Sequence, residues 1–225
     1  RRAPSVLFLF ALVWAAPIRA RAWTEAQVTS VAARVELASD ATAHVRLDLK
    51  IAVHGGFLTE LELAGLDPGL ELDPSVPVVL TAVESGEQRI PSVEVRRDGR
   101  VTFRFRTREA PRRGQYTVSL AYVTSLAERG VTMLESGDVR FTWTLPGWRS
   151  GLDAVRIHVV APRGAAPHTS THWDDRTITV ARRDLGDRVE IDLERAHLPR
   201  TVPLVVAIDI PRTSVAASLR TSVTA

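Results

Sequence analysis

The strict alternation of apolar and polar residues most limits what this chain can fold into. From residue 31 onward, run after run places an apolar side chain at every second position, which is the period of a strand with one buried face. No stretch shows a long helical period. The predicted strands lie within 31–37, 45–53, 93–95, 101–105, 116–122, 139–145, 155–159, 178–180, 189–193 and 204–210, with weaker candidates at 57–63 and 78–83.

Short strands separated by Gly, Pro, Asp and Ser predict an all-β fold, an antiparallel β-sandwich of the immunoglobulin-like kind. The longest break in the alternation, 125–137, suggests two packed sandwich halves, an N-terminal domain over 23–127 and a C-terminal β domain over 128–212. A single extended sandwich is the alternative. The Ser/Thr/Ala-rich residues 213–225 are predicted to form a flexible tail.

Two hairpins have predicted registers. In the first, a turn at 39–40 sets Leu37 opposite Val45, which brings Glu36 opposite Arg46 on the polar face. In the second, a three-residue loop over 97–99 sets Val95 opposite Val101, with Gly99 in the left-handed position that such a loop needs. Two Leu-Asp-Pro segments, 66–68 and 72–74, predict turns, and calcium coordination is the alternative.

The N-terminal residues have the order of a secretory signal peptide. Arg1 and Arg2 precede the apolar run 6–16, and the Ala-Arg-Ala triplet at 20–22 offers a cleavage site. The run is shorter than the roughly 20 residues of a membrane-spanning helix. We therefore expect residues 1–22 to be removed from a periplasmic, secreted or envelope-associated protein. An uncleaved signal anchor is the alternative and would be its only contact with the membrane.

Charge and cysteine content exclude several functions. Removal of residues 1–22 removes four arginines and no acidic residue, so the mature chain would contain 25 basic and 26 acidic residues. Nucleic-acid binding thereby loses its support from composition. The chain has no cysteine, which excludes disulfides, thiolate metal sites and a cysteine nucleophile.

Three segments resemble exported bacterial β-sandwich proteins of unknown function. They are "ASDATAHVRLDL", "GGFLTELELAGL" and "VRFTWTLPGWRSGLDAVRIHVVAPRG", and the resemblance covers residues 28–164. In those proteins an extracytoplasmic domain often precedes a membrane helix. The resemblance implies a fold and a compartment, and it carries no catalytic signature.

The segment "PHTSTHWDD", 167–175, is the densest group of potential metal ligands in the sequence. On a strand, His168, His172 and Asp174 would project from one face, and this set could bind zinc or another divalent ion. The alternative is a solvated loop in which the aspartates form a turn.

Other residues could bind a ligand. Trp148 and Trp173 could stack on sugar rings, although loop tryptophans are also commonly packed. Arg104 and Arg106 lie on the outer face of one strand and could bind an anionic glycan, although such residues also protect sheet edges.

No catalytic or cofactor-binding motif is present in the sequence. The leading hypothesis is an exported, non-catalytic binding or structural module of the bacterial cell envelope without a cofactor, whose partner is an envelope protein or a glycan. The alternatives are a carbohydrate-binding module that uses the loop tryptophans and a metal-dependent hydrolase with a His/His/Asp site. The identity of the partner and the oligomeric state are left open.

Overall fold

The computed structural model describes residues 24–127, 131–134, 137–168 and 178–216. Within these ranges the chain forms strands, turns and one 3-10 helix, which confirms the all-β prediction. No helix in them is long and apolar enough to cross a membrane. The strands are β1 Thr24–Leu37, β2 Thr42–Gly55, β3 Glu60–Leu63, β4 Glu71–Leu72, β5 Val79–Ala82, β6 Gln88–Arg89, β7 Ser92–Val95, β8 Val101–Arg104, β9 Gly114–Ser125, β10 Val131–Met133, β11 Val139–Leu145, β12 Ala154–Pro162, β13 Ala166–Pro167, β14 Ile178–Asp184, β15 Arg188–Arg195 and β16 Leu204–Ile210, and the 3-10 helix is η1 Arg212–Ser214.

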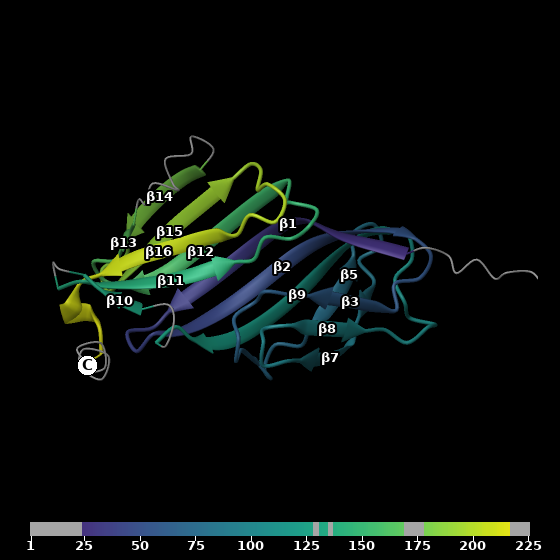
Figure 1. The fold of residues 1–225 in the computed structure, drawn as a ribbon, viewed down its shortest axis with the longest axis horizontal. Helices are drawn as coiled ribbons and strands as arrows, with labels where there is room; N and C mark the ends of the chain where they lie inside the picture. The colour runs from purple at the N-terminus through teal and green to yellow at the C-terminus, as the bar shows by residue number, and fades with distance from the viewer. Residues whose placement is uncertain (1–23, 128–130, 135–136, 169–177, 217–225) are drawn as a thin grey trace, which may run out of the picture.

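The described residues form one large sheet of nine strands around the long strands β1 and β2 (Figure 1). Its order is β14-β15-β12-β1-β2-β9-β5-β6, and β4 also pairs with β9. β1 and β12 run parallel, with Ser30 opposite Ala154, whereas the other neighbours run antiparallel. The sheet contains strands from both 23–127 and 128–212, and the division of the chain into two domains stays a prediction.

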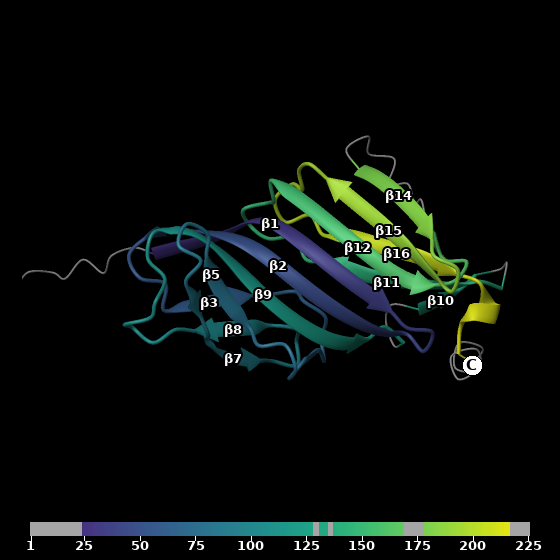
Figure 2. The ribbon, with the colours of Figure 1, turned by 180° about the vertical axis from the view of Figure 1, so that it is seen from behind.

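Two smaller sheets lie at opposite ends of the large one (Figures 1 and 2). One has the order β10-β11-β16-β13, and the other has the order β3-β8-β7. Alternate residues of β2 from Val45 to Val53 are at most 1% exposed, as the alternation predicts. They belong to one continuous hydrophobic cluster that includes Phe103 of β8 and Phe141 of β11. The core therefore lies on one face of the large sheet, and the opposite face is called the outer face below.

A single carboxylate links the large sheet to the four-stranded sheet. Asp67, in the turn after β3, accepts a hydrogen bond at Oδ2 from the hydroxyl of Tyr122 in β9 (2.9 Å) and another from Nε1 of Trp143 in β11 (3.0 Å). Burial, and next the negative charge of Asp67, raise the pKa of Tyr122 well above its usual value. Both Leu-Asp-Pro segments do form turns, since Asp67 O accepts from Leu70 N and Asp73 Oδ1 accepts from the backbone N of Ser75.

The register predicted for the β7–β8 hairpin is confirmed. Val95 lies opposite Val101 and Val93 opposite Phe103. Gly99 has φ 79°, in the left-handed region, as the three-residue loop requires. An added Cβ at Gly99 would also lie only 2.0 Å from the carbonyl oxygen of Leu66, so this position needs glycine for two reasons.

The register predicted for the β1–β2 hairpin is wrong by two residues. Leu37 lies opposite Ala43, and Arg46 lies opposite Arg34. The expected cross-strand pair of Glu36 with Arg46 does not form. Glu36 instead pairs with Arg34 of its own strand, at 2.8 Å between Nε and Oε1. The faces of both strands are as predicted, because a shift of two residues preserves the alternation.

The physical reason for this error lies in the loop. Ala38 N donates to Thr42 O (2.9 Å), so the loop has the same three-residue form as 97–99. Its last residue, Ala41, has φ 67° although it is not glycine. Asp40 Oδ1 accepts a hydrogen bond from Thr42 N (3.0 Å), and this bond lowers the pKa of Asp40. The sequence shows no glycine to mark this left-handed residue.

The described part of the segment predicted as a tail reaches Ala216. Val215 is 2% exposed, Ser214 Oγ donates to Arg163 O (2.9 Å), and Ala216 N donates to Ser39 O (2.9 Å). These contacts join the end of the described chain to the turn after β12 and to the β1–β2 loop. Residues 217–225 lie outside the described ranges.

Candidate functional site

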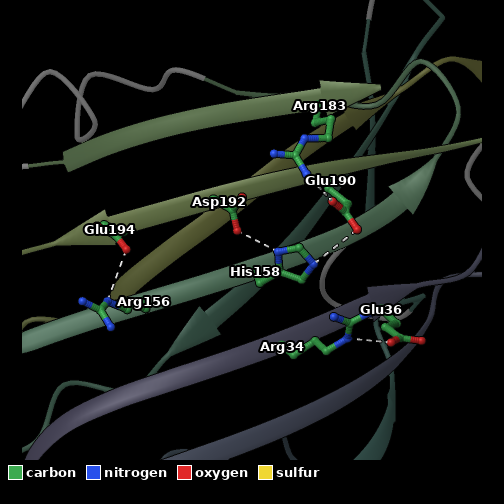
Figure 3. A network of polar contacts seen from close by, with 8 residues as sticks. All are labelled: Arg34, Glu36, Arg156, His158, Arg183, Glu190, Asp192 and Glu194. Atoms are coloured by element: carbon green, nitrogen blue, oxygen red, sulfur yellow. Dashed lines mark hydrogen bonds and ion pairs between the residues drawn. The ribbon is translucent and has the colours of Figure 1, made fainter. Parts of the chain in front are cut away.

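Charged side chains cross the outer face of the large sheet in paired rows (Figure 3). Arg156 on β12 lies opposite Glu194 on β15, with 3.2 Å between Nε and Oε1. His158 lies opposite Asp192, with 2.7 Å between Nδ1 and Oδ1, and its Nε2 is 3.8 Å from Glu190 Oε1. Strand register alone brings these polar side chains together.

A shallow hollow of about 560 Å³ lies in this face. It exists because Ala32, Thr179 and Ala181 are short and stand between longer charged side chains. Arg34, Asp48 and Arg156 each pair with an opposite charge, on Glu36, Arg46 and Glu194 respectively, and Asp192 contacts the ring of His158. The polar groups of the hollow are therefore engaged by neighbouring side chains, and its geometry fits a solvated sheet face.

A second depression, the Trp148 cleft, has a volume of about 650 Å³ and lies where the start of β1, strand β3 and two loops meet. Trp148 is half-buried and packs against the core. Its Nε1 is buried and has no acceptor among the described residues, so the exposed part of the ring is carbon surface. Trp173, the other tryptophan predicted to bind sugar, lies outside the described ranges. The polar residues that line the cleft are Glu25, Gln27, Glu62, Arg149, Ser150 and Arg200.

The loop that carries Trp148 is held in place on two sides. An added Cβ at Gly147 would lie 2.5 Å from the backbone carbon of Thr201, so only glycine allows this approach. Thr201 N donates to Trp148 O (2.9 Å), and Ser150 Oγ donates to Val28 O (3.1 Å). The position of the indole is therefore set before a ligand arrives, which lowers the entropy cost of binding.

The two carboxylates of the Trp148 cleft are already engaged. Glu62 Oε1 lies 3.6 Å from Arg100 Nε, and Glu25 Oε1 accepts a hydrogen bond from Gln27 Nε2 (2.9 Å). The hydroxyl of Ser150 donates to a backbone carbonyl rather than to a histidine or a carboxylate. The cleft thus contains no nucleophile paired with a base among its described lining residues.

The two arginines of the Trp148 cleft, unlike its two carboxylates, are not engaged by described neighbours. Arg149 and Arg200 are exposed, and in the described parts of the chain their side chains make no ion pair or hydrogen bond. Because Glu62 is balanced by Arg100, the remaining charges are those of both arginines and of Glu25. The cleft therefore offers a net positive charge next to an aromatic ring.

The structure places only one of the predicted metal ligands. His168 Nδ1 lies 2.6 Å from Arg140 Nη2 and 3.4 Å from Asp209 Oδ2. When Arg140 donates to Nδ1, that lone pair is occupied and Nε2 carries the proton, which leaves no free nitrogen for a metal. His172 and Asp174 lie outside the described residues, which contain no group of three potential ligands. The metal site stays a prediction.

The predicted basic strip is partly neutralised by neighbouring strands. Arg104 Nε lies 3.2 Å from Glu60 Oε2 on β3, and Nη1 lies 2.8 Å from Glu94 Oε2 on β7. The hydrogen bond to Glu60, and next the charge of Glu94, raise the pKa of Arg104. Arg106 is exposed beyond the end of β8. Both arginines are exposed, but of the two only Arg106 makes no ion pair with a described residue.

Sequence reasoning found Trp148 but missed most of its surroundings. Glu25, Gln27, Glu62 and Arg200 come from segments far apart in the chain, so no local spacing marks them. Arg149 directly follows Trp148, and this adjacency was the one available signal. Neither a known protein family nor a curated protein matches this chain. The interpretation of the cleft therefore depends on its own geometry.

Proposed function

We propose that this chain is an exported, non-catalytic binding module of the bacterial cell envelope, built as an immunoglobulin-like β-sandwich. The sandwich is supported by the single hydrophobic cluster that joins both smaller sheets to one face of the large sheet. Export is supported by the order of charged, apolar and small residues over 1–22. The resemblance of 28–164 to exported bacterial proteins agrees with both.

The Trp148 cleft carries the proposal of binding. It combines a fixed, half-buried aromatic ring with a small number of convergent polar groups, as ligand sites commonly do. Its carboxylates are engaged by Gln27 and Arg100, and its one hydroxyl is bound to a backbone carbonyl. These contacts favour recognition over bond cleavage. A tryptophan with an exposed carbon surface also favours a sugar ligand, which is the carbohydrate-binding alternative.

Export and the lack of catalysis are tested directly. The full chain is expressed in a bacterium, and the protein from the periplasmic fraction is analysed by N-terminal sequencing and mass spectrometry. We expect a mature chain that starts at Trp23 and shows no turnover across a panel of glycosidase, esterase and peptidase substrates. Recovery of an uncleaved chain from the cytoplasm would contradict export, and turnover that is lost in Trp148→Ala would contradict the non-catalytic proposal.

Binding is tested with matched variants. Immobilised wild-type protein, Trp148→Ala and Arg106→Gln are each exposed to bacterial envelope polysaccharide, and the retained sugar is quantified. Arg106 is an exposed arginine that does not line the cleft, so its replacement controls for general charge effects. We expect wild type and Arg106→Gln to retain sugar and Trp148→Ala to lose it. Equal retention by all three proteins would contradict the role of the cleft.

A further inference from the structure

We infer that the Trp148 cleft binds an acidic saccharide, with the sugar ring on Trp148 and the carboxylate of the sugar held by Arg149 and Arg200. This inference rests on the proposed binding function and names its ligand class. It combines three observations about the same cleft: the exposed carbon surface of the indole, the two arginines whose side chains have no partner among the described residues, and the Glu25–Gln27 pair.

The aromatic ring explains why the ligand is a sugar. Because Trp148 Nε1 is buried, the part of the side chain that lines the cleft offers no hydrogen-bond donor. An apolar aromatic surface suits the C–H groups on one side of a pyranose ring, whose hydroxyls then point to its rim. The contacts of Gly147 and Ser150 hold the loop, so the ring does not have to be ordered by the ligand.

The arginines explain why the sugar is acidic. Among the described residues, Arg104, Arg140 and Arg156 pair with carboxylates, whereas the side chains of Arg149 and Arg200 have no such partner. A guanidinium binds a carboxylate through two parallel hydrogen bonds, and such charge-assisted bonds are among the stronger ones. A ligand carboxylate would supply the partner that these two side chains lack within the described part of the chain.

The remaining polar groups fit hydroxyls rather than further charges. Gln27 donates one N–H to Glu25, which leaves its other N–H, its carbonyl oxygen and the second Glu25 oxygen for the ligand. Sugar hydroxyls both donate and accept, so they match this mixed set. The hollow of the outer face lacks this combination, since no Phe, Tyr or Trp lines it and its two arginines pair with the carboxylates of Glu36 and Glu194.

The test uses two sugars that differ in charge. Isothermal titration calorimetry compares trigalacturonate with neutral α-1,4-linked galactotriose, in which hydroxymethyl groups replace the carboxylates. For the full chain we expect trigalacturonate to bind about tenfold more tightly or better, with an affinity that falls as salt is added. Arg149→Gln and Arg200→Gln should each weaken trigalacturonate binding about tenfold and leave galactotriose binding unchanged. Trp148→Ala should weaken both, and Arg106→Gln neither.

The outcomes separate this inference from the proposed function. Equal affinity for both sugars, or unchanged trigalacturonate binding in both arginine variants, would overturn the inference that the ligand is acidic. If binding of both sugars is nevertheless lost in Trp148→Ala, the proposed binding function of the cleft still holds. Failure of both sugars to bind would overturn the inference, and retention of envelope polysaccharide that depends on Trp148 would then still support the proposed function. Circular dichroism verifies folding, and if Trp148→Ala unfolds, the two exposed arginine positions decide the result.

Discussion

Removal of the Asp67 carboxylate should strongly destabilise the fold. In Asp67→Ala, the hydroxyl of Tyr122 and the indole N–H of Trp143 both lose the acceptor that they share. Tyr122 is 1% exposed and Trp143 is 3% exposed, so neither donor can turn to water without disrupting the core. An unsatisfied buried polar group costs about 1–3 kcal/mol, so the two donors together predict a loss of about 2–6 kcal/mol in the free energy of unfolding.

Urea denaturation followed by far-ultraviolet circular dichroism measures this loss. With a slope of about 2 kcal/mol per molar urea, the midpoint should fall by about 1–3 M. A double variant, Asp67→Ala with Tyr122→Phe, removes one of the two unsatisfied donors and should regain part of the lost stability. This gain is expected only if Asp67 acts as the shared acceptor. If Asp67→Ala instead removed a packing contact, the Tyr122→Phe substitution would lower the stability further.

Asp73 provides the matched control. It lies in the second Leu-Asp-Pro segment, where its carboxylate accepts hydrogen bonds at the surface from the backbone N (2.8 Å) and the hydroxyl (2.6 Å) of Ser75 and from no other described residue. Asp73→Ala should therefore shift the midpoint much less than Asp67→Ala. Equal shifts for the two variants, or a double variant less stable than Asp67→Ala, would refute the reasoning that Asp67 stabilises the fold through two buried donors.

Three further predictions follow from the structure. Because the pKa of Tyr122 is raised in the folded state, the unfolded chain loses the hydroxyl proton first as the pH rises. The free energy of unfolding should therefore fall above about pH 10, more steeply in wild type than in Tyr122→Phe. Denaturation at several pH values measures this difference. Gly99→Ala places a Cβ 2.0 Å from Leu66 O, whereas the Cβ of Gly86→Ala, at a similar φ of 70°, meets no atom within 4 Å. In thermal denaturation Gly86→Ala should lose about 1–2 kcal/mol of stability, and Gly99→Ala should lose at least twice as much. Leu47→Ala, at a fully buried position of β2, should cost about 2–5 kcal/mol, and a loss below 1 kcal/mol would contradict the assigned core face.

The burial pattern of the strands could be predicted because it is a local property. Alternation assigned the buried faces of β1, β2 and β11 correctly, including Trp143 in the core. The β1–β2 register failed because Ala41 adopts a left-handed conformation that sequence normally signals with glycine. The parallel pairing of β1 with β12 leaves no local trace, since each strand alone looks like any other amphipathic strand.

The candidate site could be predicted only where its residues are adjacent in sequence. Trp148 was singled out as a loop aromatic, and Arg149 follows it. Arg200 and Gln27 enter the cleft through tertiary packing, which spacing along the chain does not encode. Arg104 illustrates the converse, because its two carboxylate partners come from strands on either side and only the sheet order reveals them.

The parallel pairing of β1 with β12 has a consequence for the order in which the fold is completed. β1 begins at Thr24, yet Ser30 finds its partner Ala154 only after most of the chain has been synthesised. Contacts between such distant positions slow folding, so the N-terminal strand keeps one open edge during this time. An open strand edge can pair with other chains, so newly synthesised β1 is a natural segment for chaperones to protect until β12 is available.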